Sequence, residues 1–164
     1  MYISILAILF ISAGCLAQTT EATNTKKVYD PSDNAEVAIA KAVSKAANES
    51  KHVLLQIGGN WCRWCLAFDQ KVSTVDTLKK EIDANYVVYH VNHSKENWNW
   101  EVLKTLDYPQ RFGFPVFVIL DGNGNRLHTQ NSEYLEEGKG HSTDKILQFL
   151  KHWSPAAIDA KNYK

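Results

Sequence analysis

The sequence has little cysteine, no excess of charge of either sign and no nucleotide-binding motif. Its 18 basic and 18 acidic residues leave the 164-residue chain with a formal net charge of zero. Nothing therefore attracts nucleic acid or an anionic surface electrostatically, and we expect no nucleic-acid partner. A dinucleotide-binding glycine motif and a phosphate-binding loop are both missing from the sequence, so we expect no cofactor.

No apolar run in the sequence is long enough to cross a bilayer comfortably, but the first one has the length of a secretory h-region. It extends without a charge from Ile3 to about Leu16, and the small residues before Gln18 predict a signal peptide over residues 1–17. Two alternatives stay open. In the first, Ser12-Ala13-Gly14-Cys15 resembles a lipoprotein box, so that cleavage falls before Cys15 and lipid is attached to this cysteine. In the second, the apolar segment stays uncleaved as an anchor.

The three cysteines become a single pair if residues 1–17 are removed. Cys62 and Cys65 are then the only cysteines of the exported chain. Export routes allow thiols to be oxidised, and one pair provides no framework of structural disulfides. The pair is therefore a candidate for redox chemistry, for a metal site or for ordinary packing.

Alternating strand and helix patterns predict one α/β domain with a mixed sheet. We expect a flexible polar leader over residues 18–30, a folded domain over 31–154 and a C-terminal tail over 155–164. Hydrophobic residues make up 45% of the chain, which is enough for a packed core. Asp33 and Glu36 have capping-box spacing at the start of the first helix. Strands are predicted over 52–59, 86–94, 116–120 and 126–130, and helices over 33–48, 75–84, 98–106 and 143–153, with one more helix directly after the cysteines.

The spacing of Cys62 and Cys65 fits some kinds of site better than others. Haem attachment needs a histidine directly after the second cysteine, where this sequence has Leu66. A zinc site needs two more ligands, and the only close histidine pair, His90 and His93, would face opposite sides of a strand. Zinc is thus a weak alternative, and we expect no metal. Ordinary packing of two small hydrophobic side chains is the third alternative.

The position of the pair at the start of a helix favours redox chemistry. Unpaired N–H groups and the positive end of the helix dipole stabilise a thiolate in the first helical turn. Cys62 is expected there and is the candidate nucleophile, and Arg63 adds positive charge beside it. Cys65 shares an inward face with Phe68 and Val72, and it is the candidate resolving thiol.

The element order and two motifs resemble the thioredoxin fold. Trp61-Cys62-Arg63-Trp64-Cys65 matches the active-site motif of that family, and Gly113-Phe114-Pro115 matches the loop that holds its cis-proline. The resemblance covers about residues 33–153 and implies a thioredoxin-like fold, with a central mixed β-sheet flanked by helices. The stretches WCRWCLAFDQKV and GFPVFVILDGNGN are similar to small exported thioredoxin-like proteins related to the periplasmic domain of the transmembrane disulfide-interchange reductase.

The resemblance also implies roles for five residues near the cysteines. A cis Pro115 would leave the backbone N–H and C=O of Phe114 free to bind an extended substrate chain, while an ordinary turn proline is the alternative. Trp61 would shield the disulfide, and Trp64 would offer an apolar docking surface. Together with Arg63, these residues form the expected substrate-binding set.

One position departs from the family pattern. Thioredoxin has a buried acid six residues before the first cysteine, and this sequence has Gln56 there. An amide cannot act as a base near neutral pH, so another group must take the proton of Cys65. Asp69 is the candidate for this proton transfer, with a solvated surface acid as the alternative. His90 corresponds in the resemblance to a basic residue that the family often has on the strand after the active-site helix. The alternative is a buried strand histidine without a role in the reaction.

The resulting expectation is an exported thiol–disulfide oxidoreductase, located in a bacterial periplasm. It would exchange dithiols and disulfides with protein substrates through a Cys62 mixed disulfide that Cys65 resolves. A reductase or isomerase would need a membrane electron donor, and an oxidase would need a membrane oxidant. The alternative is a non-catalytic thioredoxin-fold binding module or chaperone that uses the surface of Trp61, Trp64 and Phe114.

Overall fold

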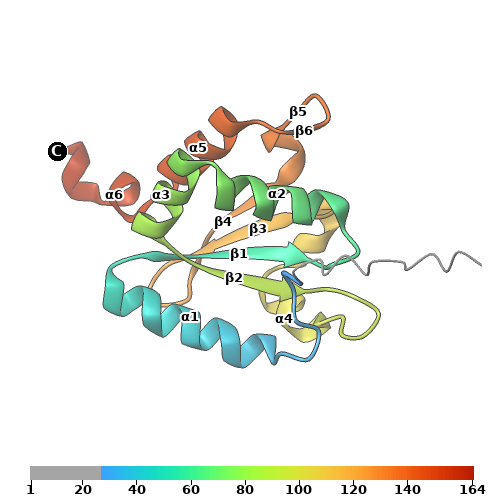
Figure 1. Cartoon of the computed structure of the whole chain (residues 1–164). Coiled ribbons are helices and arrows are strands. Elements are labelled where there is room, and N and C mark those ends of the chain that lie inside the picture. The colour runs from blue at the N-terminus through green and yellow to red at the C-terminus, as the bar shows by residue number, and fades with distance from the viewer. Residues whose placement is uncertain (1–26) are drawn as a thin grey trace, which may run out of the picture.

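A four-stranded sheet with helices on both faces forms the centre of the molecule (Figure 1). The computed structural model describes residues 27–164. The predicted signal peptide, the lipid site considered at Cys15 and most of the predicted leader lie outside these residues. Between residues 27 and 164, no helix combines the length and the apolar character needed to span a membrane.

The elements follow one another in the order predicted, with several short additions. The strands are β1 (His52–Gly58), β2 (Tyr86–Asn92), β3 (Val116–Leu120), β4 (Arg126–Asn131), β5 (Glu136–Glu137) and β6 (Gly140–His141). The α-helices are α1 (Ala35–Glu49), α2 (Arg63–Thr74), α3 (Asp76–Asn85), α4 (Trp100–Thr105), α5 (Thr143–His152) and α6 (Pro155–Ile158). Three 3-10 helices are η1 (Pro109–Phe112), η2 (Ser132–Leu135) and η3 (Ala160–Tyr163).

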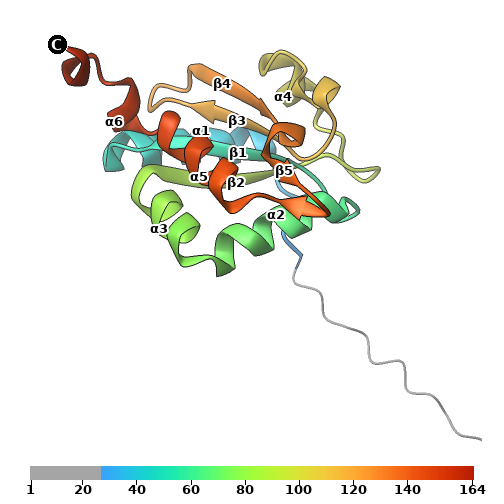
Figure 2. The same cartoon turned by 90° about the horizontal axis from the view of Figure 1, so that it is seen from above.

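The main sheet is mixed, as the sequence predicts. Its strand order is β2-β1-β3-β4, which Figure 2 shows from above. β1 and β2 are parallel, with His52 opposite Tyr86, whereas β3 is antiparallel to both of its neighbours. Every residue of β1 is buried, because it is a central strand with helices on both faces.

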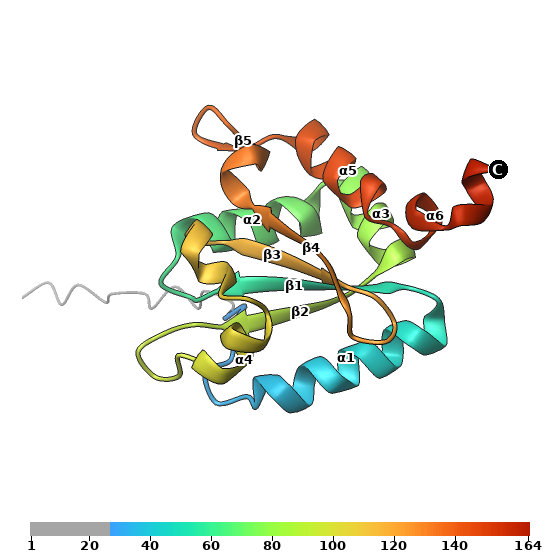
Figure 3. The same cartoon turned by 180° about the vertical axis from the view of Figure 1, so that it is seen from behind.

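Two apolar cores lie on the two faces of this sheet. α1 and α4 cover one face, and α2, α3 and α5 cover the other (Figures 1 and 3). Side chains alternate along β1, so that Leu55 belongs to the first core and Leu54 to the second. Gln56 therefore shares the face of Leu54 and lies under α2, the helix that begins directly after Cys62 and contains Cys65.

The start of α1 differs by one residue from the predicted capping box. Asn34, not Asp33, is the N-cap, and its side chain accepts a hydrogen bond of 3.1 Å from the backbone N–H of Val37. The carboxylate of Asp33 instead accepts a hydrogen bond of 3.0 Å from the hydroxyl of Tyr89. Asp and Asn both cap helices well, so the local pattern does not distinguish the two positions. The contact of Asp33 with Tyr89 on β2 leaves Asn34 as the cap.

The chain is packed from Val28 onward, earlier than the predicted end of the leader at residue 30. The side chain of Asn60 accepts hydrogen bonds from the backbone N–H groups of Val28 and Tyr29 and donates one to the carbonyl of Tyr29. Tyr29 is 1% exposed. A single buried aromatic residue within a polar segment produces no periodic pattern. The prediction therefore included Tyr29 in the leader.

The interior of the second core supports a stability prediction. Phe117 is fully buried, with its ring centroid 4.3 Å from that of Phe68 and 6.0 Å from that of Phe149. We expect Phe117→Ala to lower the free energy of unfolding by about 3–5 kcal/mol, because it removes buried apolar area and leaves a cavity. Denaturant unfolding of the oxidised protein measures this change.

A matched control is Tyr134→Ala, which also truncates an aromatic ring but at a position that is 72% exposed. Its free energy of unfolding should stay within about 0.5 kcal/mol of the parent protein. Equal losses in the two variants would contradict the core assignment of Phe117.

Candidate redox site

Cys62 and Cys65 form a disulfide where β1 passes into α2. Their Cα atoms are 5.2 Å apart. Cys62 is the N-cap of α2, and its Sγ accepts a hydrogen bond of 3.1 Å from the backbone N–H of Cys65. Cys62 is 6% exposed and Cys65 is 0% exposed. The more exposed cysteine is therefore also the one at the positive end of the helix, where a thiolate is stabilised.

Gly58, the last residue of β1, lies directly beneath Cys65. A Cβ atom added to Gly58 would overlap the Sγ atom of Cys65 and would lie 3.1 Å from the hydroxyl oxygen of Tyr29. The close approach of strand and sulfur thus requires a residue without a side chain. It also shows that the Cys65 sulfur and the Tyr29 hydroxyl border the same small space.

A neutral polar pair, Gln56 and Tyr29, occupies the interior next to Cys65. The side-chain nitrogen of Gln56 donates hydrogen bonds to the Tyr29 hydroxyl at 2.7 Å and to the carbonyl of Cys65 at 3.0 Å. Burial raises the pKa of Tyr29 well above its usual range; the hydrogen bond from Gln56 lowers it, and the charge of Asp69 raises it further. The phenol therefore keeps its proton and is available as a donor.

The carboxylate of Asp69 and the imidazole of His90 contact each other close to Gln56. The Nε2 atom of His90 lies 3.2 Å from Oδ1 of Asp69, and the two side chains are 24% and 22% exposed. A cavity of about 210 Å³ is lined by Gln56, Asp69 and His90 among others, and the His90 ring meets that of Tyr29 edge-on at 5.3 Å. Asp69 and His90 are thus both partly buried, between a solvated surface position and the core.

The predicted substrate-binding residues surround the outer side of the disulfide. Trp61 is 59% exposed and meets the Phe114 ring edge-on at 5.5 Å. The Phe114–Pro115 peptide bond is cis. Arg63 is exposed, and Trp64 is half-buried and packs with Phe114 against the cluster that contains both cysteines.

Trp64 also rests on a buried histidine that the sequence did not single out. The ring of His141, on β6, meets Trp64 and Phe68 edge-on, at 5.3 Å in both cases. Burial lowers the pKa of His141, and the positive charge of Lys71 lowers it further. A neutral imidazole is thus part of the apolar support beneath Trp64.

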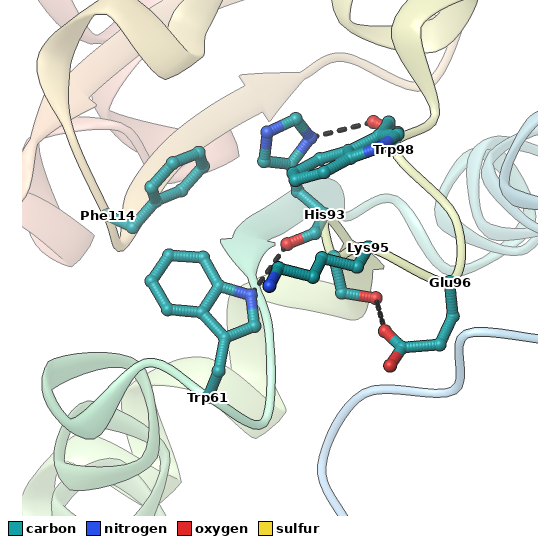
Figure 4. Close-up of a pocket in the computed structure, with 7 residues that line it drawn as sticks. Trp61, His93, Lys95, Glu96, Trp98 and Phe114 are labelled. Atoms are coloured by element: carbon teal, nitrogen blue, oxygen red, sulfur yellow. Dashed lines mark hydrogen bonds between the residues drawn. The ribbon is translucent and has the colours of Figure 1, made fainter.

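The two histidines considered as zinc ligands have other partners. His90 pairs with Asp69, and Nδ1 of His93 lies 2.7 Å from the carbonyl of Trp98. Across residues 27–164, no three His, Cys, Asp or Glu side chains come together as a metal site would require. His93 instead helps to form a groove of about 520 Å³ beside Trp61 and Phe114 (Figure 4).

Comparisons with known proteins agree with this architecture. A family model described as a thioredoxin-like domain matches residues 39–135, more than half of the chain. The structure is similar to a disulphide isomerase from Xylella fastidiosa Temecula1, with a TM-score of 0.67 and 24% identity over 76% of this chain and 94% of that one. It is also similar to a thioredoxin from Thermus thermophilus, with a TM-score of 0.52 and 15% identity over 75% and 88%. A comparison with curated proteins finds no match. At these identities the likeness to the two structures concerns the fold alone.

The contact between Gly58 and Cys65 leads to a prediction. We expect Gly58→Ala to lower the free energy of unfolding of the oxidised protein by about 1–3 kcal/mol, because the new methyl group displaces Cys65 in a packed interior. Gly140→Ala is the control, since nothing lies within 4 Å of a Cβ at Gly140. Denaturant unfolding compares the two variants, and equal stability would contradict the close contact.

Proposed function

The chain belongs to the thioredoxin-like domain family, and from this premise we propose that it is an exported enzyme that reduces or isomerises disulfides of protein substrates. Its family and its cysteine pair make it a thiol–disulfide oxidoreductase. The observation that carries the proposal is the Cys62–Cys65 disulfide at the start of α2, beside the loop of Phe114 and Pro115.

The first step of the proposed reaction uses Cys62. In the reduced protein its thiolate attacks one sulfur of a substrate disulfide, which forms a mixed disulfide and releases the first substrate thiolate to take up a proton. The Cys65 N–H and the other free N–H groups of the first helical turn stabilise the attacking thiolate. Arg63 adds a nearby positive charge.

The second step uses Cys65. Its thiol loses a proton and attacks Sγ of Cys62, so that the mixed disulfide breaks, the second substrate thiol leaves and the Cys62–Cys65 disulfide forms. Two electrons have then passed from the protein to the substrate. Because Gln56 cannot accept the proton, we assign proton removal to Asp69, acting through water in the adjacent cavity, with His90 holding the carboxylate and Tyr29 donating a hydrogen bond nearby.

The loop before β3 provides the binding edge for the substrate chain. The cis bond at Pro115 lies next to the cysteines, and we assign to the backbone of Phe114 the pairing with an extended substrate segment. Trp61, Arg63 and Trp64 complete the contact surface. Backbone pairing is independent of sequence, which suits an enzyme that acts on several protein disulfides.

Continued reduction requires an electron source in an oxidising compartment. We assign this role to a membrane electron donor that returns Cys62 and Cys65 to the dithiol form after each cycle. A membrane oxidant would fit an oxidase instead. The proposed location is a bacterial periplasm, either as a free protein cut after Ala17 or attached by lipid at Cys15.

A second candidate function follows from the exposed aromatic side chains near the disulfide. Trp61, Trp98 and Trp100 are all exposed to solvent, and such a surface can hold unfolded chains without redox chemistry. The double variant Cys62→Ser, Cys65→Ser separates the two functions. A holdase keeps its protection of an aggregating client in this variant, whereas an oxidoreductase loses all turnover.

The reduction potential of the cysteine pair is the principal test. We expect one reversible two-thiol equilibrium between roughly −270 and −180 mV, the range of thioredoxin and of disulfide isomerases. Equilibration of the purified protein with graded glutathione or dithiothreitol, followed by counting of free thiols, measures it. A value near roughly −120 mV would indicate an oxidant, and the lack of any reversible step would contradict the redox function itself.

The proton-transfer role of Asp69 gives a kinetic prediction. We expect Asp69→Asn to slow the decay of the protein–substrate mixed disulfide at neutral pH by at least about tenfold, because a positioned base is lost. Acid quenching and intact-mass spectrometry follow the mixed disulfide after the reduced protein meets a peptide disulfide. The control is Glu137→Gln, which removes an exposed carboxylate on β5, outside the cavity next to Asp69. An unchanged decay in Asp69→Asn would exclude this role.

A further inference from the structure

An aromatic groove lies beside the disulfide, at the end of β2. Its volume is about 520 Å³, which is within the usual size of small-ligand pockets. Figure 4 shows Trp61 and Phe114 on one side and the segment from His93 to Trp98 on the other. The lining residues are Trp61, His93, Ser94, Lys95, Glu96, Trp98 and Phe114.

Aromatic rings form most of the walls of this groove and touch one another. His93 stacks on Phe114 with a centroid separation of 5.0 Å and meets Trp98 at 4.9 Å. Trp61 meets Phe114 edge-on, and Trp100 supports Trp98 from behind in a stacked pair at 5.7 Å. The rings leave faces and edges for a further ring, since aromatic pairs prefer offset and edge-to-face contacts.

Hydrogen bonds between the wall residues hold the groove in shape. The indole N–H of Trp61 donates to the carbonyl of His93 at 2.8 Å. Nδ1 of His93 lies 2.7 Å from the carbonyl of Trp98. A carbonyl oxygen only accepts, so Nδ1 carries the proton and donates.

The loop that carries Trp98 is also fixed by its own polar side chains. Asn92 donates to the carbonyl of Asn97 at 2.9 Å, and Asn99 donates to the carbonyl of Asn92 at 2.7 Å. Ser94 and Asn97 exchange two backbone hydrogen bonds of 3.1 Å. A preformed groove loses little conformational entropy when it is filled.

The groove is continuous with the redox site. Trp61 directly precedes Cys62, and Phe114 packs against the cluster that contains both cysteines. A substrate segment paired with the backbone of Phe114 would therefore bring the side chains next to its cysteine to the mouth of the groove. Lys95 and Glu96 at this site carry opposite charges, so a charged side chain gains no net attraction.

We propose that this groove binds an aromatic side chain of the substrate, located within two residues of the cysteine that Cys62 attacks. The inference rests on the proposed function and adds a substrate class to it: extended, aromatic-flanked cysteine segments. His93 and Trp98 become specificity residues for these substrates. Neither belongs to the substrate-binding set that the sequence predicts.

The test uses five-residue peptides whose central cysteine carries thionitrobenzoate in a mixed disulfide. One peptide has alanine at the four flanking positions, and the others have a single Phe or a single Leu at each of these positions. Attack by Cys62 releases coloured thionitrobenzoate, and Cys65 then attacks Sγ of Cys62 and frees the peptide thiol. Stopped-flow absorbance with the pre-reduced protein gives the second-order rate constant for each peptide.

We expect at least one Phe peptide to react about tenfold faster than the alanine peptide, a typical gain from filling one apolar pocket. The matching Leu peptide should gain less. Trp98→Ala should bring the ratio of the Phe to the alanine rate constants close to one, and Trp98→Phe, which keeps an aromatic wall, should retain most of it. Tyr134→Ala, outside the groove, should leave the ratio unchanged.

The outcomes separate this inference from the function on which it rests. Release from all peptides at equal rates would overturn the groove but leave the redox chemistry intact. Equal rates for Phe and Leu, or a Phe preference that survives in Trp98→Ala, would also overturn the aromatic assignment. If no peptide releases thionitrobenzoate, the proposed function fails and this inference fails with it. If neither Trp98 variant folds, the ratio of the Phe to the alanine and Leu rate constants in the unmodified protein still tests the inference.

Discussion

The close packing of Cys65 on Gly58 is the constraint on which the redox site depends. It brings the start of α2 down onto the end of β1, so that Cys65 is fully buried against the strand and Cys62, at 6% exposure, caps the helix. The two cysteines thereby become chemically different although they are three residues apart. A buried thiol is poorly placed for attack on a protein substrate, whereas a thiolate at the helix start is stabilised and accessible.

The polar groups below Cys65 solve a problem that burial creates. A charged group deep under the disulfide would be costly unless it were paired. This protein has the neutral Gln56 and Tyr29 there, joined by a hydrogen bond, and moves its charge outward to the pair of Asp69 and His90. The interior remains satisfied in the oxidised state, while an ionisable pair stays close by.

Sequence patterns predicted the main elements and the central chemistry, but not the parts that depend on distant contacts. The strand before the cysteines, the helix after them and the hairpin of β3 and β4 each have a local periodic or turn signal. Tyr29 and Trp98 have none. Tyr29 is a single buried aromatic residue in a polar segment. Trp98 lies in a loop that is held by asparagine side chains. Such side chains compete with helix formation, and the helix predicted over 98–106 is observed only as α4, Trp100–Thr105.

The α/β class, the disulfide-forming pair and the more exposed position of Cys62 could be predicted from the chain alone, because spacing and helix position are local properties. The contacts among the groups around that pair depend on the packing of distant segments. Gln56, Asp69 and His90 come from three different elements and meet because β1 alternates its side chains under α2 and lies beside β2. The aromatic groove likewise joins residues 61, 93, 98 and 114, whose proximity follows from sheet order and loop geometry and has no counterpart in local sequence.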